Sequence, residues 1–325
     1  MKKVKLIATG GTIASLKVAP GLGALPRMSG EELIDAAPGV RELAELEVES
    51  FSNLPSQHLS LEQLFGLAGK VRRAMEEEGF QGVVVSMGTN ILEEAAYMFD
   101  LTWAGKEPVV VTGALRNPSL LSSDASINIY NAVAIAADEQ ARGMGVLVAL
   151  GGEVHAARDV TKTQTQSVTT FQSPGLGPLG RVNNGRLSLY RRALVREHIS
   201  PPALRARVEL IKAAAGMGSE LIEGALQSGA DGLVIEGFGG GHVTPFMLAG
   251  IKRALAEGVP VILVSRCFSG ELLEGAYEDE GGAKHLRSLG VLFGGSLSGQ
   301  KARIKLTLAL SLTREPRELA RYFSS

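Results

Sequence analysis

Two loops of this sequence place a threonine directly after glycine. Thr12 follows Gly10 and Gly11, and Thr89 follows Gly88. The glycines allow the backbone to come close to a ligand, and their N–H groups can line a site for an oxyanion. A simple turn between a strand and a helix explains each Gly-Thr pair equally well when it is taken alone. The loop around Thr12 lacks the G-x-G-x-x-G pattern, so a dinucleotide site there is not supported.

A third loop carries a lysine among small hydroxyl side chains. Lys162 lies between Thr161 and Thr163, a short distance after the apolar segment Gly145–Leu150. A lysine in such a place is usually exposed to solvent beside a loop. The alternative is a partly buried base, because burial disfavours the ammonium and lowers the pKa of the amine. The residues of this loop leave both interpretations open.

These loops follow short apolar runs that are rich in β-branched residues. Nearly continuous apolarity indicates strands that are covered on both faces, as in a parallel sheet. Segments 61–78 and 244–257 show helical spacing with charged outer faces. Strands that alternate with helices predict an α/β fold, and ligands bind such sheets beyond the carboxyl ends of the strands. The expected strands are Val4–Ala8, Gly82–Ser86, Pro108–Thr112, Gly145–Leu150, Gly232–Glu236 and Pro260–Ser265.

The 325-residue chain is long enough for two domains. Segment 196–206 contains Pro201 and Pro202 and few apolar residues, which indicates a linker. We therefore expect an N-terminal α/β domain over residues 1–195 that carries the threonine loops, and a smaller C-terminal α/β domain over residues 207–325.

Charge and composition exclude several classes of function. Lys and Arg number 33 against 34 Asp and Glu, so the chain has no basic field to hold nucleic acid. No apolar run approaches the about 20 residues of a membrane span, and the first residues are typical of a strand, so a cytoplasmic location is expected. The five histidines lack ligand spacing, so neither a metal nor another cofactor is expected. The single cysteine, Cys267, is expected to be buried as packing.

Together, the three loops resemble those of the L-asparaginase family. Thr9-Gly10-Gly11-Thr12-Ile13-Ala14 and Gly88-Thr89, with Glu93-Glu94, are similar to its two threonine loops, and 158–163 (Arg-Asp-Val-Thr-Lys-Thr) is similar to its lysine loop. Further similar blocks follow in the family's order between residue 5 and about residue 310. They include Pro55-Ser56-Gln57, Gly113-Ala114-Leu115-Arg116, Gly177-Pro178-Leu179-Gly180 and Lys301-Ala302-Arg303.

The resemblance implies an amidohydrolase that converts L-asparagine to L-aspartate and ammonia through a threonine acyl-enzyme. It implies that Thr12 is the nucleophile and that Thr89 and Lys162 form a second pair, with Lys162 as the proton acceptor. These roles agree with chemistry, because a threonine hydroxyl is a poor nucleophile until a base takes its proton, and a desolvated lysine can be that base.

The resemblance also implies a substrate-binding set. Ser56 and Gln57 are expected to hold the α-carboxylate and α-amino groups of the substrate. Backbone N–H groups at Gly11 and Gly88 are expected to stabilise the tetrahedral oxyanion. Asn90 takes the place of an aspartate that normally pairs with the substrate ammonium and with the lysine.

Two departures from the family pattern affect this expectation. Asn90 can accept a hydrogen bond but brings no charge, and exchanging a charged hydrogen bond for a neutral one should cost about 1–2 kcal/mol. The family also supplies a tyrosine from the loop after the first threonine, whereas residues 15–28 contain none. Residues 20–26 still resemble a lid with glycine hinges. The chemistry is expected to survive while recognition of an amino acid weakens.

Three functions are compatible with these residues. The first is an asparaginase, the second a related amidase with altered substrate specificity, and the third a low-activity or non-enzymatic amide-binding homologue. A subunit of a tRNA-dependent amidotransferase shares the threonine loops, but the neutral charge of the chain argues against it. The family builds its site at a subunit boundary, so a homodimer or homotetramer with a small amide substrate is expected, without nucleic acid or membrane.

Overall fold

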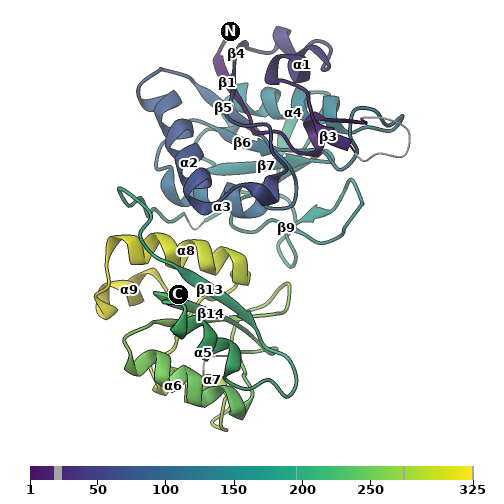
Figure 1. Ribbon diagram of the computed structural model, residues 1–325. Helices are drawn as coiled ribbons and strands as arrows, with labels where there is room; N and C mark the ends of the chain where they lie inside the picture. The colour runs from purple at the N-terminus through teal and green to yellow at the C-terminus, as the bar shows by residue number, and fades with distance from the viewer. Residues whose placement is uncertain (18–23, 195, 274, 324–325) are drawn as a thin grey trace. The chain divides into compact units, whose positions relative to one another are not determined.

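The computed structural model describes residues 1–17, 24–194, 196–273 and 275–323. The chain divides into two compact units, Met1–His198 and Ile199–Ser325. The first contains an eight-stranded, mostly parallel sheet and the second a four-stranded parallel sheet (Figure 1). The expected α/β class is therefore confirmed.

The large sheet of the first unit has the strand order β12-β11-β8-β7-β6-β5-β1-β4. Its strands from β4 to β7 run parallel, and β8, β11 and β12 extend it with antiparallel pairs. The four strands expected in this part of the chain are present to within one residue at each end. The bounds are β1 Lys3–Ala8, β4 Glu45–Ser50, β5 Gly82–Ser86, β6 Val109–Thr112, β7 Val146–Leu150, β8 Glu153–Ala156, β11 Gly180–Asn183 and β12 Arg186–Leu189.

Helices cover both faces of this sheet. Side chains of α1 (Gly30–Asp35) and α4 (Ala125–Ala137) share a buried cluster with alternate strand residues such as Leu6 and Val84. Helices α2 (Leu61–Glu76) and α3 (Leu92–Thr102) pack against each other and against β5 and β7. A capping box begins α1 and another begins α2, which accounts for the sharp start of both helices.

Short elements complete the first unit at the edges of the sheet. They are the 3₁₀ turns η1 Thr12–Ala14, η2 Val40–Glu42, η3 Ser56–His58 and η4 Glu139–Ala141, the pair β2 Ser15–Lys17 with β3 Ala24–Pro26, and the pair β9 Thr161–Lys162 with β10 Phe171–Gln172. Two of the turns and the β9–β10 pair carry residues that the sequence singled out.

The second unit has a parallel sheet in the order β13-β14-β15-β16. Segment 244–257, expected as one helix, begins with the 3₁₀ turn η5 (Pro245–Met247) and continues as α6. The strands are β13 Val208–Lys212, β14 Gly232–Gly237, β15 Val261–Ser265 and β16 Leu292–Phe293, and the helices are α5 Glu220–Gln227, α6 Leu248–Ala256, α7 Ala283–Ser288, α8 Gly299–Leu312 and α9 Pro316–Tyr322.

The expectation for Cys267 was wrong. Strand β15 ends at Ser265, and the chain then turns outward, so that the thiol of Cys267 is exposed. Within the described part of the chain, every helix is too short or too polar to cross a membrane.

Candidate active site

The two threonine loops leave the sheet side by side. Strands β1 and β5 are parallel neighbours, and their last residues, Ala8 and Ser86, are directly paired. Beyond that pair, both the backbone N–H and the Oγ1 of Thr9 donate hydrogen bonds to the carbonyl oxygen of Ser86, over 3.0 and 3.1 Å. The loops that carry Thr12 and Thr89 are thus held together at the carboxyl edge of the sheet, where open α/β sheets bind ligands.

Glycine is required where the two loops touch. Gly11 has a φ of +81°, and a Cβ on it would lie only 2.2 Å from the backbone nitrogen of Gly88. A Cβ on Gly88 would lie 2.8 Å from Oγ of Ser56 and 3.2 Å from Cα of Gly11. Any larger residue would push the loops apart, because real Cβ atoms do not tolerate such contacts. The glycines therefore bring the two threonines to one site.

A pocket of about 220 Å³ opens at this junction. Thr12, partly exposed at the start of η1, and Thr89, which is 6% exposed, both line it. Its size suits a small ligand, since pockets for drug-sized molecules are typically about 300–1,000 Å³. The described lining residues are Gly11, Thr12, Ser15, Ala24, Pro26, Pro55, Ser56, Gln57, Gly88, Thr89 and Asn90.

Lys162 contacts the second threonine loop through its amine. Its Nζ donates a hydrogen bond of 2.9 Å to Oγ1 of Thr89 and one of 3.4 Å to Oδ1 of Asn90. The backbone N–H of Lys162 donates to Oε2 of Glu93, in the first turn of α3, over 2.8 Å. Burial lowers the pKa of Lys162 from its ordinary value, and the nearby carboxylate of Glu93 opposes that shift. Of the two interpretations of this lysine, the structure favours the partly buried amine.

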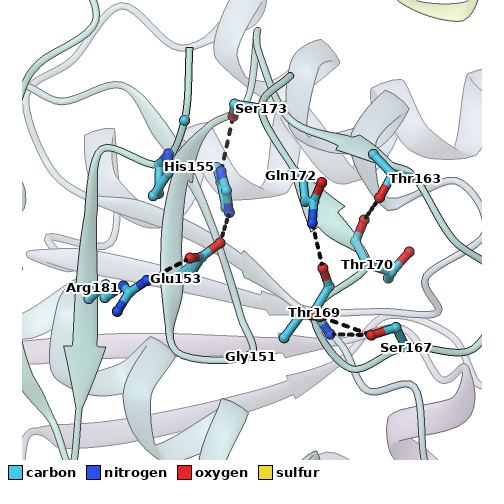
Figure 2. A network of polar contacts seen from close by, with 12 residues as sticks. Gly151, Glu153, His155, Thr163, Ser167, Thr169, Thr170, Gln172, Ser173 and Arg181 are labelled. Carbon is cyan, nitrogen blue, oxygen red and sulfur yellow. Dashed lines mark hydrogen bonds and ion pairs between the residues drawn. The ribbon is translucent and has the colours of Figure 1, made fainter. Parts of the chain in front are cut away.

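The hairpin that carries Lys162 is held by hydroxyl groups. Lys162 in β9 pairs with Phe171 in β10, and Thr163 donates from both its N–H and its Oγ1 to the carbonyl oxygen of Thr170. Figure 2 shows the Thr163–Thr170 contact beside those between Ser167 and Thr169. These bonds fix the short strands, which are too short to be stable by themselves.

A buried histidine ties the end of this hairpin to the main sheet. Ser173 follows β10 directly, and its Oγ lies 3.0 Å from Nδ1 of His155 in β8 (Figure 2). Nε2 of the same ring lies 3.5 Å from Oε2 of Glu153, whose other carboxylate oxygen lies 3.4 Å from a guanidinium nitrogen of Arg181. Burial lowers the pKa of His155, so its neutral form holds the contact at neutral pH.

The structure brings all eight of the expected site residues together. Seven of them, Gly11, Thr12, Ser56, Gln57, Gly88, Thr89 and Asn90, line the one pocket, and Lys162 reaches it through Thr89 and Asn90. Of the segment expected to form a lid, residues 20–23 lie outside the described part, whereas Ala24 and Pro26 line the pocket.

Two contacts were not expected from the sequence. Ser15 lines the pocket, and its Oγ donates a 2.8 Å hydrogen bond to the carbonyl oxygen of Gly11. In the sequence, the only indication of a role for Ser15 was that it carries a hydroxyl three positions after Thr12. The carboxylate of Glu93 positions the backbone of Lys162. In the sequence, Glu93 was indicated only as one of the two glutamates after the second threonine loop, and neither glutamate was expected to have a role.

Comparison with known proteins gives the same assignment over the whole chain. The family model described as "Asparaginase, N-terminal" matches residues 3–195, and the model described as "Glutaminase/Asparaginase C-terminal domain" matches residues 207–323. The L-asparaginase of Bacillus licheniformis is 34% identical over 314 residues, which cover 97% of both chains.

Two further matches cover nearly all of the chain. The probable periplasmic L-asparaginase of Haemophilus influenzae is 34% identical over 334 residues, covering 99% of this chain and 93% of the relative. The crystal structure of a probable cytoplasmic L-asparaginase from Campylobacter jejuni matches with a TM-score of 0.90 at 30% identity, covering 99% of each chain. Taken with the threonine loops and the lysine that contacts the second of them, these matches show that the chain belongs to the L-asparaginase family of amidohydrolases.

Proposed function

We propose that the protein hydrolyses the side-chain amide of L-asparagine to L-aspartate and ammonia through an acyl-enzyme on Thr12. One observation carries this proposal. Thr12 and Thr89 line the same small pocket, and the amine of Lys162 lies 2.9 Å from the hydroxyl oxygen of Thr89. The pocket thus offers a nucleophile together with a hydroxyl that is in direct contact with a base.

In the acylation step, Oγ1 of Thr12 attacks the carbonyl carbon of the amide while its proton is transferred toward Lys162. The lowered pKa of Lys162 supports its role as acceptor, since its neutral amine forms at a lower pH than that of a free lysine. The backbone N–H groups of Gly11 and Gly88, which line the pocket, are the proposed donors to the oxyanion. The C–N bond then breaks, and the nitrogen takes a proton and leaves as ammonia.

In the deacylation step, water attacks the threonine ester and its proton is transferred to the same base. The C–O bond to Thr12 breaks, the hydroxyl of Thr12 recovers its proton, and aspartate is released. In each of the two steps, Lys162 thus accepts a proton and then gives it back, as expected for a two-step displacement. Ser56 and Gln57, which also line the pocket, are the proposed partners of the substrate carboxylate.

A related amidase with altered specificity is the second candidate. The observation in its favour is the contact of Asn90 with Lys162 on one side and with Gln57 on the other, over 3.4 and 3.0 Å. An uncharged amide thus occupies the position that would neutralise the ammonium of an amino acid. The reaction is the same in both candidates, and only the preferred amide differs.

The substitution Thr12→Ala tests the proposal. It should abolish ammonia release from asparagine and leave the melting temperature nearly unchanged, because Thr12 lies at the pocket surface. Thr12→Ser, which keeps the hydroxyl, should retain measurable turnover, and Ser15→Ala is a control that removes a different pocket hydroxyl. Full turnover by the Thr12→Ala variant would refute Thr12 as the nucleophile.

We also propose that the protein works in the cytoplasm as a homodimer or homotetramer. The solved relative from Campylobacter jejuni, described as cytoplasmic, supports this location, although the relative from Haemophilus influenzae is described as periplasmic. Fractionation of the native cells would decide between the two locations. Light scattering tests the assembly.

A further inference from the structure

The proposed base, Lys162, is bound at its amine and at its backbone to one short stretch of chain, residues 89–93. The amine donates to Oγ1 of Thr89 over 2.9 Å, and the backbone N–H donates to Oε2 of Glu93 over 2.8 Å. Glu93 lies in the first turn of α3, which directly follows the second threonine loop. The same segment that carries Thr89 therefore also fixes the point from which the lysine side chain starts.

The carboxylate of Glu93 is well placed to hold this backbone. Its residue is only 8% exposed, and the first turn of a helix favours a negative charge through its unpaired N–H groups and its dipole. A hydrogen bond to a charged acceptor is roughly twice as strong as a neutral one. Strand β9 has two residues and cannot keep its position by its own ladder, so this bond matters for where Lys162 lies.

The charge of Glu93 also acts on the amine of Lys162. Burial lowers the pKa of this amine, and the carboxylate of Glu93 opposes that shift. Thr89 and Asn90, which the amine contacts, are uncharged. A negative charge near an amine favours its ammonium form. Glu93 therefore stabilises a proton on Lys162.

The other described neighbours of Lys162 contribute little net charge. Phe171, which pairs with Lys162 in β10, is apolar. Arg158 and Asp159, in the loop before β9, carry opposite charges 3.7 Å apart, and the fields of such a pair largely cancel at a distance. The amine of Lys162 should therefore respond directly to a change of charge at Glu93.

We infer that Glu93 is a positioning residue for the reaction, which holds Lys162 at Thr89 and stabilises the ammonium that forms when Lys162 accepts the proton of Thr12. This inference rests on the proposed role of Lys162 as the base. Loss of the charge should have two effects of opposite sign. The amine becomes neutral at a lower pH, but it is then a weaker base, and the efficiency of a general base follows its strength.

Two substitutions separate the charge of Glu93 from its hydrogen bond. Glu93→Gln removes the charge and keeps an oxygen that can accept from the N–H of Lys162. Its kcat/KM, measured as ammonia release from L-asparagine, should begin to rise at a lower pH than in the wild type, whereas kcat on the high-pH plateau should fall about two-fold or more. Glu93→Ala removes both functions, and its kcat should fall about ten-fold or more, since small misplacements of a catalytic group are costly.

A merely structural role for Glu93 would not shift the pH dependence and the plateau in opposite senses. KM should change little in both variants, because Glu93 lies outside the described pocket lining. Glu62→Gln is the matched control. It removes an exposed carboxylate from the first turn of α2 and should leave both the pH profile and the plateau unchanged.

The protonation of Lys162 can also be measured without turnover. The folded protein is acetylated briefly with acetic anhydride at a series of pH values, and the remaining amines are acetylated with the heavy reagent after unfolding. Cleavage at arginine then gives peptide 159–181, whose only lysine is Lys162, so the light fraction reports the neutral amine. The midpoint of this labelling should lie at a lower pH in Glu93→Gln than in the wild type.

An unchanged labelling midpoint in Glu93→Gln, a plateau kcat in that variant at or above the wild-type level, or wild-type kcat in Glu93→Ala would overturn the inference. If Glu93→Ala does not fold, Glu93→Gln decides alone. Absence of ammonia release from every amide would refute the proposed function, and the labelling midpoint would then still decide whether Glu93 stabilises the proton on Lys162.

Discussion

Replacement of Lys162 by methionine removes the amine and nearly preserves the length of the side chain. The variant loses the hydrogen bonds from Nζ to Thr89 and to Asn90, which span 2.9 and 3.4 Å. A positioned general base contributes about 10²–10⁴-fold to a rate, so kcat should fall by about that factor. The backbone contact with Glu93 uses the N–H of residue 162 and should persist in the variant.

The effect of the same change on stability should be small. Two hydrogen bonds are lost, each worth about 1 kcal/mol. Opposing this loss, the partly buried ammonium no longer has to be desolvated, and that desolvation is the main reason for the lowered pKa of Lys162. The melting temperature should therefore move by no more than about 5 °C, given that 1 kcal/mol corresponds to about 2–4 °C in a chain of this size class. A large drop in rate without unfolding would be the signature of a lost base.

If Lys162 is the base, both the rate and the stability of the protein should depend on pH in a direction that its pKa determines. Lys162 must be neutral to accept a proton, so wild-type kcat/KM should rise with pH through the lowered pKa of Lys162, below the ordinary value of 10.5. Between these two values the unfolded chain binds more protons than the folded one, so the stability that Lys162 contributes also rises with pH in that window. The Lys162→Met variant should lack both rises.

The assay is ammonia release from asparagine between pH 5 and pH 10, with unfolding followed in parallel at each pH. Lys106→Met is the matched control, because Lys106 is exposed and lies outside the pocket lining. A Lys162→Met variant that keeps more than about a tenth of the wild-type kcat with the same dependence on pH would refute the assignment of Lys162 as the base.

Two further predictions concern the junction of the threonine loops and the assembly. Gly88→Ala should reduce kcat/KM by about ten-fold or more while the protein stays folded, because the new Cβ would lie 2.8 Å from Oγ of Ser56 and 3.2 Å from Cα of Gly11. Gly66→Ala is the control, because its new Cβ would meet nothing within 4 Å. Equal activity in the two variants would contradict the reasoning. Light scattering should give at least twice the chain mass of 34.2 kDa, and a fully active species of that single mass at nanomolar concentration would contradict the proposed oligomer.

The strands that position the site could be predicted because they are apolar on both faces. The runs that became β1, β5, β6 and β7 are almost wholly buried, and such runs are distinctive in a sequence. Strand β4 was missed because it lies at the edge of the sheet and alternates glutamate with apolar residues in Glu45–Ser50. Its pattern is equally typical of an exposed segment, and only its pairing with β1 makes it a strand.

The sequence predicted the residues that the structure brings together at the pocket, but not all of their contacts. The family resemblance gave Thr12, and it gave Thr89 and Lys162 as a pair, whereas the sequence could not show which elements bring the amine of Lys162 to Thr89. That contact depends on the two-residue strands β9 and β10 and on the link from Ser173 to His155, which are held by side-chain hydrogen bonds without a periodic signal. For the same reason, nothing in the sequence indicated that His155 contacts Ser173.

The most direct test of the central claim is to trap the acyl-enzyme. The wild-type protein should be mixed with asparagine, quenched in acid within the first turnovers, digested and mapped by mass spectrometry. The account predicts an aspartyl ester on the peptide that contains Thr12, and its absence from the Thr12→Ala variant. An ester on the peptide that contains Thr89, or rapid turnover without an ester on either threonine, would contradict it.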